Sequence, residues 1–302
     1  MASALSEFLG HRDVGKQAPA DESEIEAVSR GFNAPLPDAL VAFWQASNGA
    51  TLDRLNAHLL GTQEVLSILD ARWNPFTELG FVPLLDDHQS NLICVIVREP
   101  VAFRVARVPH DDGSRLLYRD FDSFLNGLLE ALRGGTAAVR FFHGSEGDYP
   151  ADAPRSADDQ ASARALLQCD NAYDEWNYAV QLLDASNLDE WAALLETDHF
   201  VRRNVRARMQ RMSAPAIREL LQQDAAEFRR FAQATAKAAR QAGLPVGRQQ
   251  DDALQVGNRW MSLEAFFHRR RIPNAFPRMV QWFEDLVAQR DPRARAGNFM
   301  TD

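Results

Sequence analysis

The chain has 302 residues, of which 46% are hydrophobic and 25% are charged, as in ordinary globular proteins, and its length predicts two domains. The net charge of −9 lies in the first half, because residues 1–150 carry 12 basic and 21 acidic residues. This excess argues against phosphate binding there and favours a basic partner, while the absence of an apolar run of roughly 18–20 residues argues against a membrane span.

The first half shows signals for both helices and short strands. Apolar residues at helical spacing predict helices that begin at Asp21, Leu36 and Thr62. A further helix with a wider apolar face is predicted over residues 120–133. The strand candidates are short, rich in β-branched or aromatic residues and separated by polar turns. They cover residues 57–60, 81–85, 92–97, 101–108 and 115–118. Short connections favour antiparallel neighbours, so we expect an α+β domain over residues 1–135.

The remainder of the chain favours helices. Residues 136–157 contain an edge-strand candidate at 139–142 and a loop rich in Gly, Pro and Asp, so we expect a linker there. Beyond it, apolar stripes recur at helical spacing, and the longest helix is expected to start near Ser213 and end before Gly243. We therefore expect an all-α domain over residues 158–302.

Several short motifs follow one another in a set order between residues 21 and 133. They are Glu24-Ile25-Glu26, Leu36-Pro37-Asp38-Ala39-Leu40, Phe43-Trp44, Asn48-Gly49, Val82-Pro83-Leu84, Asp86-Asp87, Ser90 to Val95, Val105 to Asp112 and Tyr118 to Leu125. In order and spacing this segment resembles the SUKH superfamily, the Smi/Knr-like domains. The resemblance implies helices packed on one face of a mostly antiparallel sheet. Bacterial members are commonly immunity proteins that bind and neutralise a toxin, and no family is recognised for the C-terminal half.

Two acidic turns, Asp86-Asp87-His88 and His110-Asp111-Asp112, are the most distinctive local feature of the sequence. Imidazole and carboxylate groups together could bind a metal or form an acid–base pair, whereas Asp in a turn commonly accepts hydrogen bonds from nearby backbone. A third interpretation is an acidic rim that faces a basic protein and raises the association rate. By charge and turn position, the candidate partner-binding residues are Asp53, Asp86, Asp87, His88, Asp111 and Asp112.

Other patterns of catalysis or ligand binding are absent from the sequence. It has no Gly-x-Ser-x-Gly elbow, no phosphate-binding Gly-rich loop and no Cys-x-x-Cys pair. Cys94 lies among apolar residues that predict burial, and with Cys169 it cannot build a disulfide framework. No secretion signal opens the sequence. We expect a cytoplasmic protein with no catalytic residue, metal or cofactor.

An arginine cluster marks one predicted helix of the second half, formed by Arg202, Arg203, Arg206, Arg208 and Arg211. It could be the solvated face of an amphipathic helix, a phosphate-binding stripe or a contact for the acidic first half. Because the second half is neutral as a whole, we favour the solvated face and expect no nucleic-acid partner.

The leading hypothesis is a non-enzymatic binding protein, a bacterial immunity protein that neutralises a secreted or polymorphic toxin by stoichiometric binding. The alternative is an intracellular scaffold or regulatory adaptor whose first domain is a docking module. A third possibility is an enzyme with a site in the helical half that no motif exposes.

Overall fold

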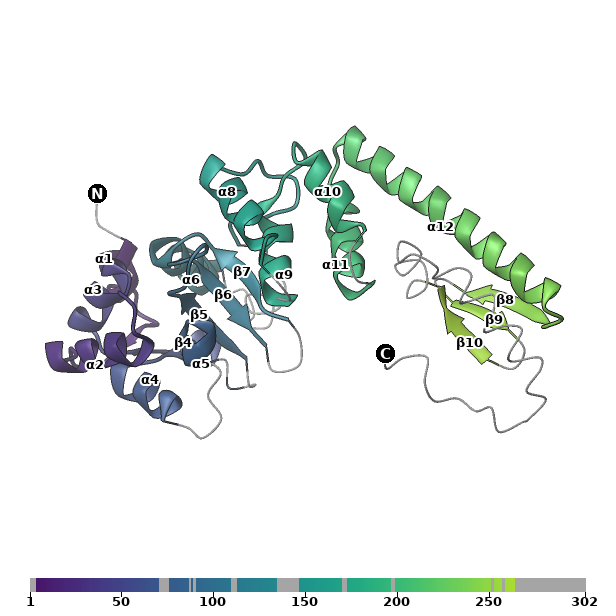
Figure 1. The fold of residues 1–302 in the computed structure, drawn as a ribbon. Helices are drawn as coiled ribbons and strands as arrows, with labels where there is room; N and C mark the ends of the chain where they lie inside the picture. The colour runs from purple at the N-terminus through teal and green to yellow at the C-terminus, as the bar shows by residue number, and fades with distance from the viewer. Residues whose placement is uncertain are drawn as a thin grey trace. The chain divides into compact units, whose positions relative to one another are not determined.

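The computed structural model describes residues 4–70, 76–86, 88, 91–109, 113–134, 147–169, 173–196, 199–250, 253–256 and 259–263. The chain forms two compact units, Met1–Asp184 and Ala185–Asp302 (Figure 1). The division falls later than the linker expected at residues 136–157, because two helices that follow this linker pack within the first unit.

The first unit is built on a seven-stranded sheet in which every strand pairs with its neighbours in sequence and all pairs are antiparallel. The strands are β1 Gly15–Lys16, β2 Ala50–Leu52, β3 Ala57–Leu59, β4 Phe81–Asp86, β5 Leu92–Ile96, β6 Val105–Val108 and β7 Arg115–Tyr118. The predicted antiparallel α+β fold is confirmed. β6 is shorter than expected because residues 101–104 form a turn, in which Arg104 N donates to Val101 O at 3.3 Å.

The helices of the first unit match the predicted positions closely. They are α1 Ala4–Leu9, α2 Glu22–Phe32, α3 Asp38–Ala46, the 3₁₀ turn η1 Asp53–Leu55, α4 Thr62–Leu69, α5 Phe76–Leu79, α6 Phe121–Gly134, α8 Ala157–Leu166 and α9 Tyr173–Leu182. The sequence did not predict α1, α5, β1 or β2. β1 has two residues and β2 three, which is too short for a strand period, and α1 and α5 span less than two helical turns.

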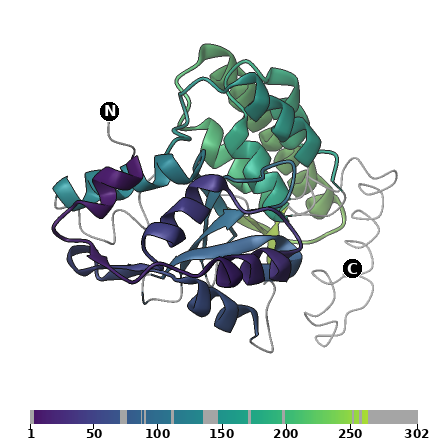
Figure 2. The ribbon, with the colours of Figure 1, turned by 90° about the vertical axis from the view of Figure 1, so that its left-hand side faces the viewer.

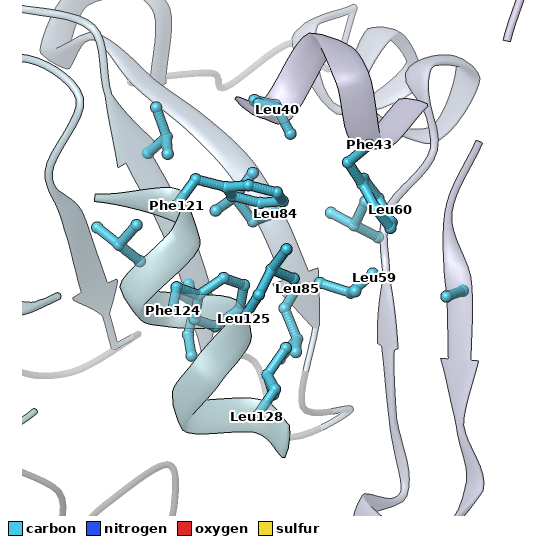
Figure 3. Packing of buried hydrophobic residues seen from close by; sticks show 14 of the residues in the cluster. Leu40, Phe43, Leu59, Leu60, Leu84, Leu85, Phe121, Phe124, Leu125 and Leu128 are labelled. Carbon is cyan, nitrogen blue, oxygen red and sulfur yellow. The ribbon is translucent and has the colours of Figure 1, made fainter. Parts of the chain in front are cut away.

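The main hydrophobic core lies between one face of the sheet and helices α1, α2, α3, α4 and α6. Figure 2 shows the purple helices on one side of the blue strands. Within this core the rings of Phe43 in α3 and Phe121 in α6 lie 5.8 Å apart, and Figure 3 shows Phe121 beside Leu84 of β4. Trp44 is fully buried, and its Nε1 donates to Leu60 O at 3.0 Å. These contacts set the helices on one face of the sheet.

The opposite face of the sheet is buried as well. Ile93 and Val95 of β5 belong to the main core. Cys94 and Ile96, which alternate with them along the strand, are also inaccessible to solvent. Side chains alternate between the two faces of a strand, so this pattern requires a cover on the second face. Helix α9 supplies part of it and packs against β7 (Figure 1).

In its described part, up to residue 263, the second unit combines helices with a small sheet. Its elements are α10 Leu188–Leu194, α11 His199–Met209, α12 Pro215–Gln241, β8 Val246–Gln250, β9 Ala253–Val256 and β10 Arg259–Ser262. The helical character and the long helix before Gly243 are confirmed. The antiparallel sheet, in the order β10-β9-β8, was not predicted, and Leu254 and Val256 of β9 pack against the C-terminal half of α12. The further helices expected beyond residue 263 lie outside the described residues.

Candidate functional site

The strand order brings the candidate residues to one end of the sheet. β2, β4 and β6 all end there, and β3, β5 and β7 begin there, because Leu52 pairs with Ala57, Asp86 with Leu92 and Arg107 with Arg115. We call this the turn end. The described residues of the connections at this end are 53–56, 88, 91, 109 and 113–114.

Two of the candidates that the structure describes are acidic residues at the turn end. Asp53 is exposed and opens η1, and Asp86 is the last residue of β4, directly opposite His58 of β3. His88 N donates to Asp86 Oδ1 at 2.7 Å, which is the local backbone contact expected of Asp in a turn. Asp87, Asp111 and Asp112 lie outside the described residues, as does His110.

Sequence reasoning missed two further groups at the turn end. His58 Nε2 lies 2.7 Å from Glu64 Oε1 of α4, and the imidazole of His58 stacks on that of His88 with ring centroids 6.0 Å apart. His58 and Glu64 are separated from His88 in sequence, so only the strand pairing could have revealed the cluster. Within the described ranges, no group of three His, Cys, Asp or Glu side chains is placed to hold a metal ion.

The turn end also carries basic residues. Arg107 of β6 pairs across the strands with Arg115 of β7, and Arg107 Nη2 donates to Asn91 Oδ1 at 3.3 Å. The end is therefore a mixed surface: the carboxylates and histidines over β2, β3 and β4 lie beside Arg54 of η1, and two further arginines lie over β6 and β7.

At the opposite end of the sheet, a buried ion pair ties the turn before β6 to α8. Arg104 Nη1 contacts Asp159 Oδ1 and donates to Tyr149 Oη at 2.8 Å. Burial alone would raise the pKa of Asp159, but hydrogen bonds from Arg104 and Ser156 outweigh it and lower that pKa. Burial raises the pKa of Tyr149. The buried guanidinium of Arg104 therefore has an opposite charge, Asp159, and a neutral acceptor, Tyr149, as hydrogen-bond partners in place of water.

The edge of β7 is closed by a side chain of α9. Gln181 Oε1 accepts from Leu116 N at 2.7 Å and its Nε2 donates to Leu116 O at 2.9 Å, as a neighbouring strand would do. Ser114 Oγ, directly before β7, and Tyr178 Oη of α9 lie 2.6 Å apart. Asp148 N donates to Leu117 O at 2.8 Å, close beside Gly147, whose φ of +51° suits glycine.

Comparison with known families agrees with this architecture. Residues 19–127 match the model of the SMI1 / KNR4 family (SUKH-1). This segment is a SUKH domain. The match runs from just before α2 into α6, which confirms the resemblance inferred for residues 21–133. No curated protein was found to match the chain.

The SUKH domain contains the described candidate residues of the turn end, whereas α8 and α9, which pack on its second face, lie outside it. Asp53, Asp86, His88, His58 and Glu64 all fall within residues 19–127. By contrast, Tyr149, Asp159 and Gln181 belong to the segment that follows the domain. The chain thus extends the SUKH domain with its own second layer of helices.

The one cysteine inside the SUKH domain is a core residue, as predicted. Cys94 is fully buried and burial raises the pKa of its thiol, so it remains protonated at neutral pH. Cys169 is exposed and free. No helix among the described residues is long and apolar enough to cross a membrane.

The arginine cluster of the second unit departs from the expected solvated face. Arg202 is 1% exposed, and its Nη2 donates to both carboxylate oxygens of Asp224 in α12 at 2.7 Å. Arg208 is buried as well. The expectation of a solvated face was wrong for these two residues, and Asp224 of α12 supplies the counter-charge for Arg202.

Proposed function

We propose that the chain is a non-enzymatic immunity protein whose SUKH domain binds a basic protein toxin and neutralises it by stoichiometric docking. The observation that carries the proposal is the charge of the unit that contains the domain. Met1–Asp184 holds 14 basic and 28 acidic residues, a net charge of −14, whereas Ala185–Asp302 holds 19 basic and 14 acidic residues. The family, often linked to immunity proteins, supports the same conclusion.

The strong charge of the first unit favours a particular kind of binding. Long-range attraction between an acidic surface and a basic partner raises the association rate well above that of neutral surfaces. Salt screens this attraction over a Debye length of about 10 Å at 0.1 M ionic strength. A toxin that acts quickly inside a cell would be captured quickly, and the mechanism needs no catalytic group in the immunity protein.

The test is co-expression with any toxin-like protein that is encoded beside the gene. In a bacterial host, the full chain is expected to restore the growth that one such toxin arrests and to form a one-to-one complex with it. If no neighbouring toxin is neutralised, the proposal fails. Several partners of modest affinity and no rescue of growth would instead favour the scaffold alternative.

A charge reversal at the turn end tests the role of the acidic rim. Asp53→Lys changes an exposed carboxylate of η1, and Asp70→Lys makes the same change at the exposed end of α4. Asp53→Lys is expected to lower the association rate about threefold at low salt, and the difference should vanish at high salt. Asp70→Lys should have the smaller effect. Equal association rates of the two variants in stopped-flow binding would show that the acidic rim at the turn end has no special role in binding.

A further inference from the structure

Exposed apolar side chains gather at the end of the sheet opposite the turn end. Among the described residues, the large hydrophobic side chains exposed by more than a third are Leu79, Phe103 and Leu188, at 38, 40 and 37%. Leu79 comes directly before Gly80, whose O accepts from Val97 N at 2.8 Å, and Phe103 N donates to Ile96 O at 2.6 Å. Two of the three residues therefore belong to the end where β4 begins and β5 ends.

Phe103 occupies a backbone position that does not suit it. It is the third residue of the turn from Val101 to Arg104 and has a φ of +68°. Turns of this kind need a positive φ at the third residue, and glycine or asparagine normally supplies it. A bulky aromatic residue in the left-handed region is strained, and such strain concentrates at functional sites. Because Phe103 is exposed, packing in the core does not explain its presence.

The turn that carries Phe103 is held in place by contacts of its neighbouring residues. The next residue is the buried Arg104, which contacts Asp159 and Tyr149, and Ser162 Oγ donates to Pro100 O at 2.9 Å. An aromatic side chain on a rigid turn loses little conformational entropy when it is buried by a partner. Aromatic anchors of this kind contribute most of the binding free energy in many interfaces.

The charges around the two apolar residues indicate the chemistry of the partner. Glu78 is exposed directly before Leu79, and Glu99 is exposed four residues before Phe103. Arg98, next to Glu99 in sequence, donates to the O of Glu78 at 2.9 Å. The unit as a whole has a net charge of −14. A partner that fits this surface has an apolar pocket bordered by Lys or Arg.

We infer that Phe103, with Leu79 beside it, is the apolar anchor that inserts into a pocket of the basic toxin. This inference rests on the proposed function and gives it a second contact surface. The acidic charge sets the rate at which the complex forms, and Phe103 sets the rate at which it dissociates.

The experiment measures binding of the full chain to the purified toxin that it neutralises, by surface plasmon resonance. Phe103→Ala is expected to raise the dissociation rate about thirtyfold with little change in the association rate. Leu188→Ala, which removes an equally exposed apolar side chain from the second unit, is the matched control and should leave both rates unchanged. A dissociation rate for Phe103→Ala within twofold of the wild type would overturn the inference.

A second variant separates loss of contact from loss of fold. Phe103→Gly removes the side chain and also removes the backbone strain, so its Tm should be no lower than that of the wild type while its binding is weakened as in Phe103→Ala. If the wild-type chain binds no toxin, the proposed function fails together with this inference. If the wild type binds and both variants bind as tightly, only the anchor is wrong.

Discussion

At the scale of single residues, the ion pair between Arg104 and Asp159 is the most consequential contact of the first unit. Asp159 is 1% exposed, and its carboxylate accepts from Arg104 and from Ser156 Oγ at 2.8 Å. Because these bonds lower the pKa of Asp159 in the folded state, the stabilisation is present above the pKa of the unfolded chain, which is about 4. It is lost as the pH falls through the folded pKa.

Asp159→Asn is therefore expected to reduce stability in a pH-dependent way. At pH 7 the variant leaves the buried Arg104 without its counter-charge and should lower the free energy of unfolding by about 3 kcal/mol. The difference from the wild type should begin to shrink below about pH 4, where Asp159 of the unfolded chain becomes protonated, and should be smallest below the lowered pKa of the folded state. Urea unfolding at several pH values measures it, with the exposed neighbour Asp158→Asn as control. A constant difference at all pH values would contradict the assignment.

Side-chain contacts between residues far apart in sequence are what the sequence predicted least well. Burial of Cys94 and the capping role of Glu24, whose Oε2 accepts from Asp21 N at 3.3 Å, follow from local patterns. The partner of Arg104 is 55 residues away in sequence, and nothing local identifies it. Burial of Arg202 likewise depends on Asp224, which lies on another helix.

At the scale of elements, the contact between α9 and β7 replaces a missing strand. Gln181 satisfies both backbone groups of Leu116, and Leu116 is fully buried. The sequence predicted β3 to β7 and most of the longer helices because their residue patterns are local. It could not show that helices beyond residue 157 belong to the first unit, because the residues that join them to the sheet are single polar side chains without a repeating pattern.

Gln181→Ala tests this contact directly. The variant leaves a buried N–H and a buried C=O of β7 unpaired, which should lower the free energy of unfolding by about 2 kcal/mol. Gln223→Ala, at an exposed position of α12, is the control and should change stability by less than about 0.5 kcal/mol. Chemical denaturation followed by tryptophan fluorescence gives both values. Equal stabilities of the two variants would show that Gln181 is dispensable.

At the scale of the whole molecule, the SUKH match covers less than the folding unit. Residues 19–127 match the family, whereas the compact unit extends from Met1 to Asp184. Without α8 and α9, the second face of the sheet would expose residues that are fully buried in the chain. These are Cys94, Ile96, Ala106 and Leu116.

A truncation experiment follows from this difference. A fragment of residues 1–184 should be monomeric and unfold in a single cooperative transition, because it retains its complete core. A fragment of residues 1–134 should aggregate or bind a hydrophobic dye, because the second face becomes an exposed apolar patch. Size-exclusion chromatography and dye fluorescence distinguish the two. A soluble, cooperative 1–134 fragment would show that α8 and α9 are accessory.

The closure of β7 by Gln181 restricts how any partner can be recognised. Many proteins capture an extended peptide by adding it as a new strand to an open sheet edge. Here one edge is occupied by an amide side chain, and the other, β1, is only two residues long and carries Lys16. Strand addition is therefore blocked at Leu116 of β7 and disfavoured at the short edge β1. This favours recognition by side chains presented by the loops and ends of the sheet, and the same features disfavour pairing of the sheet edge to edge with its own copies.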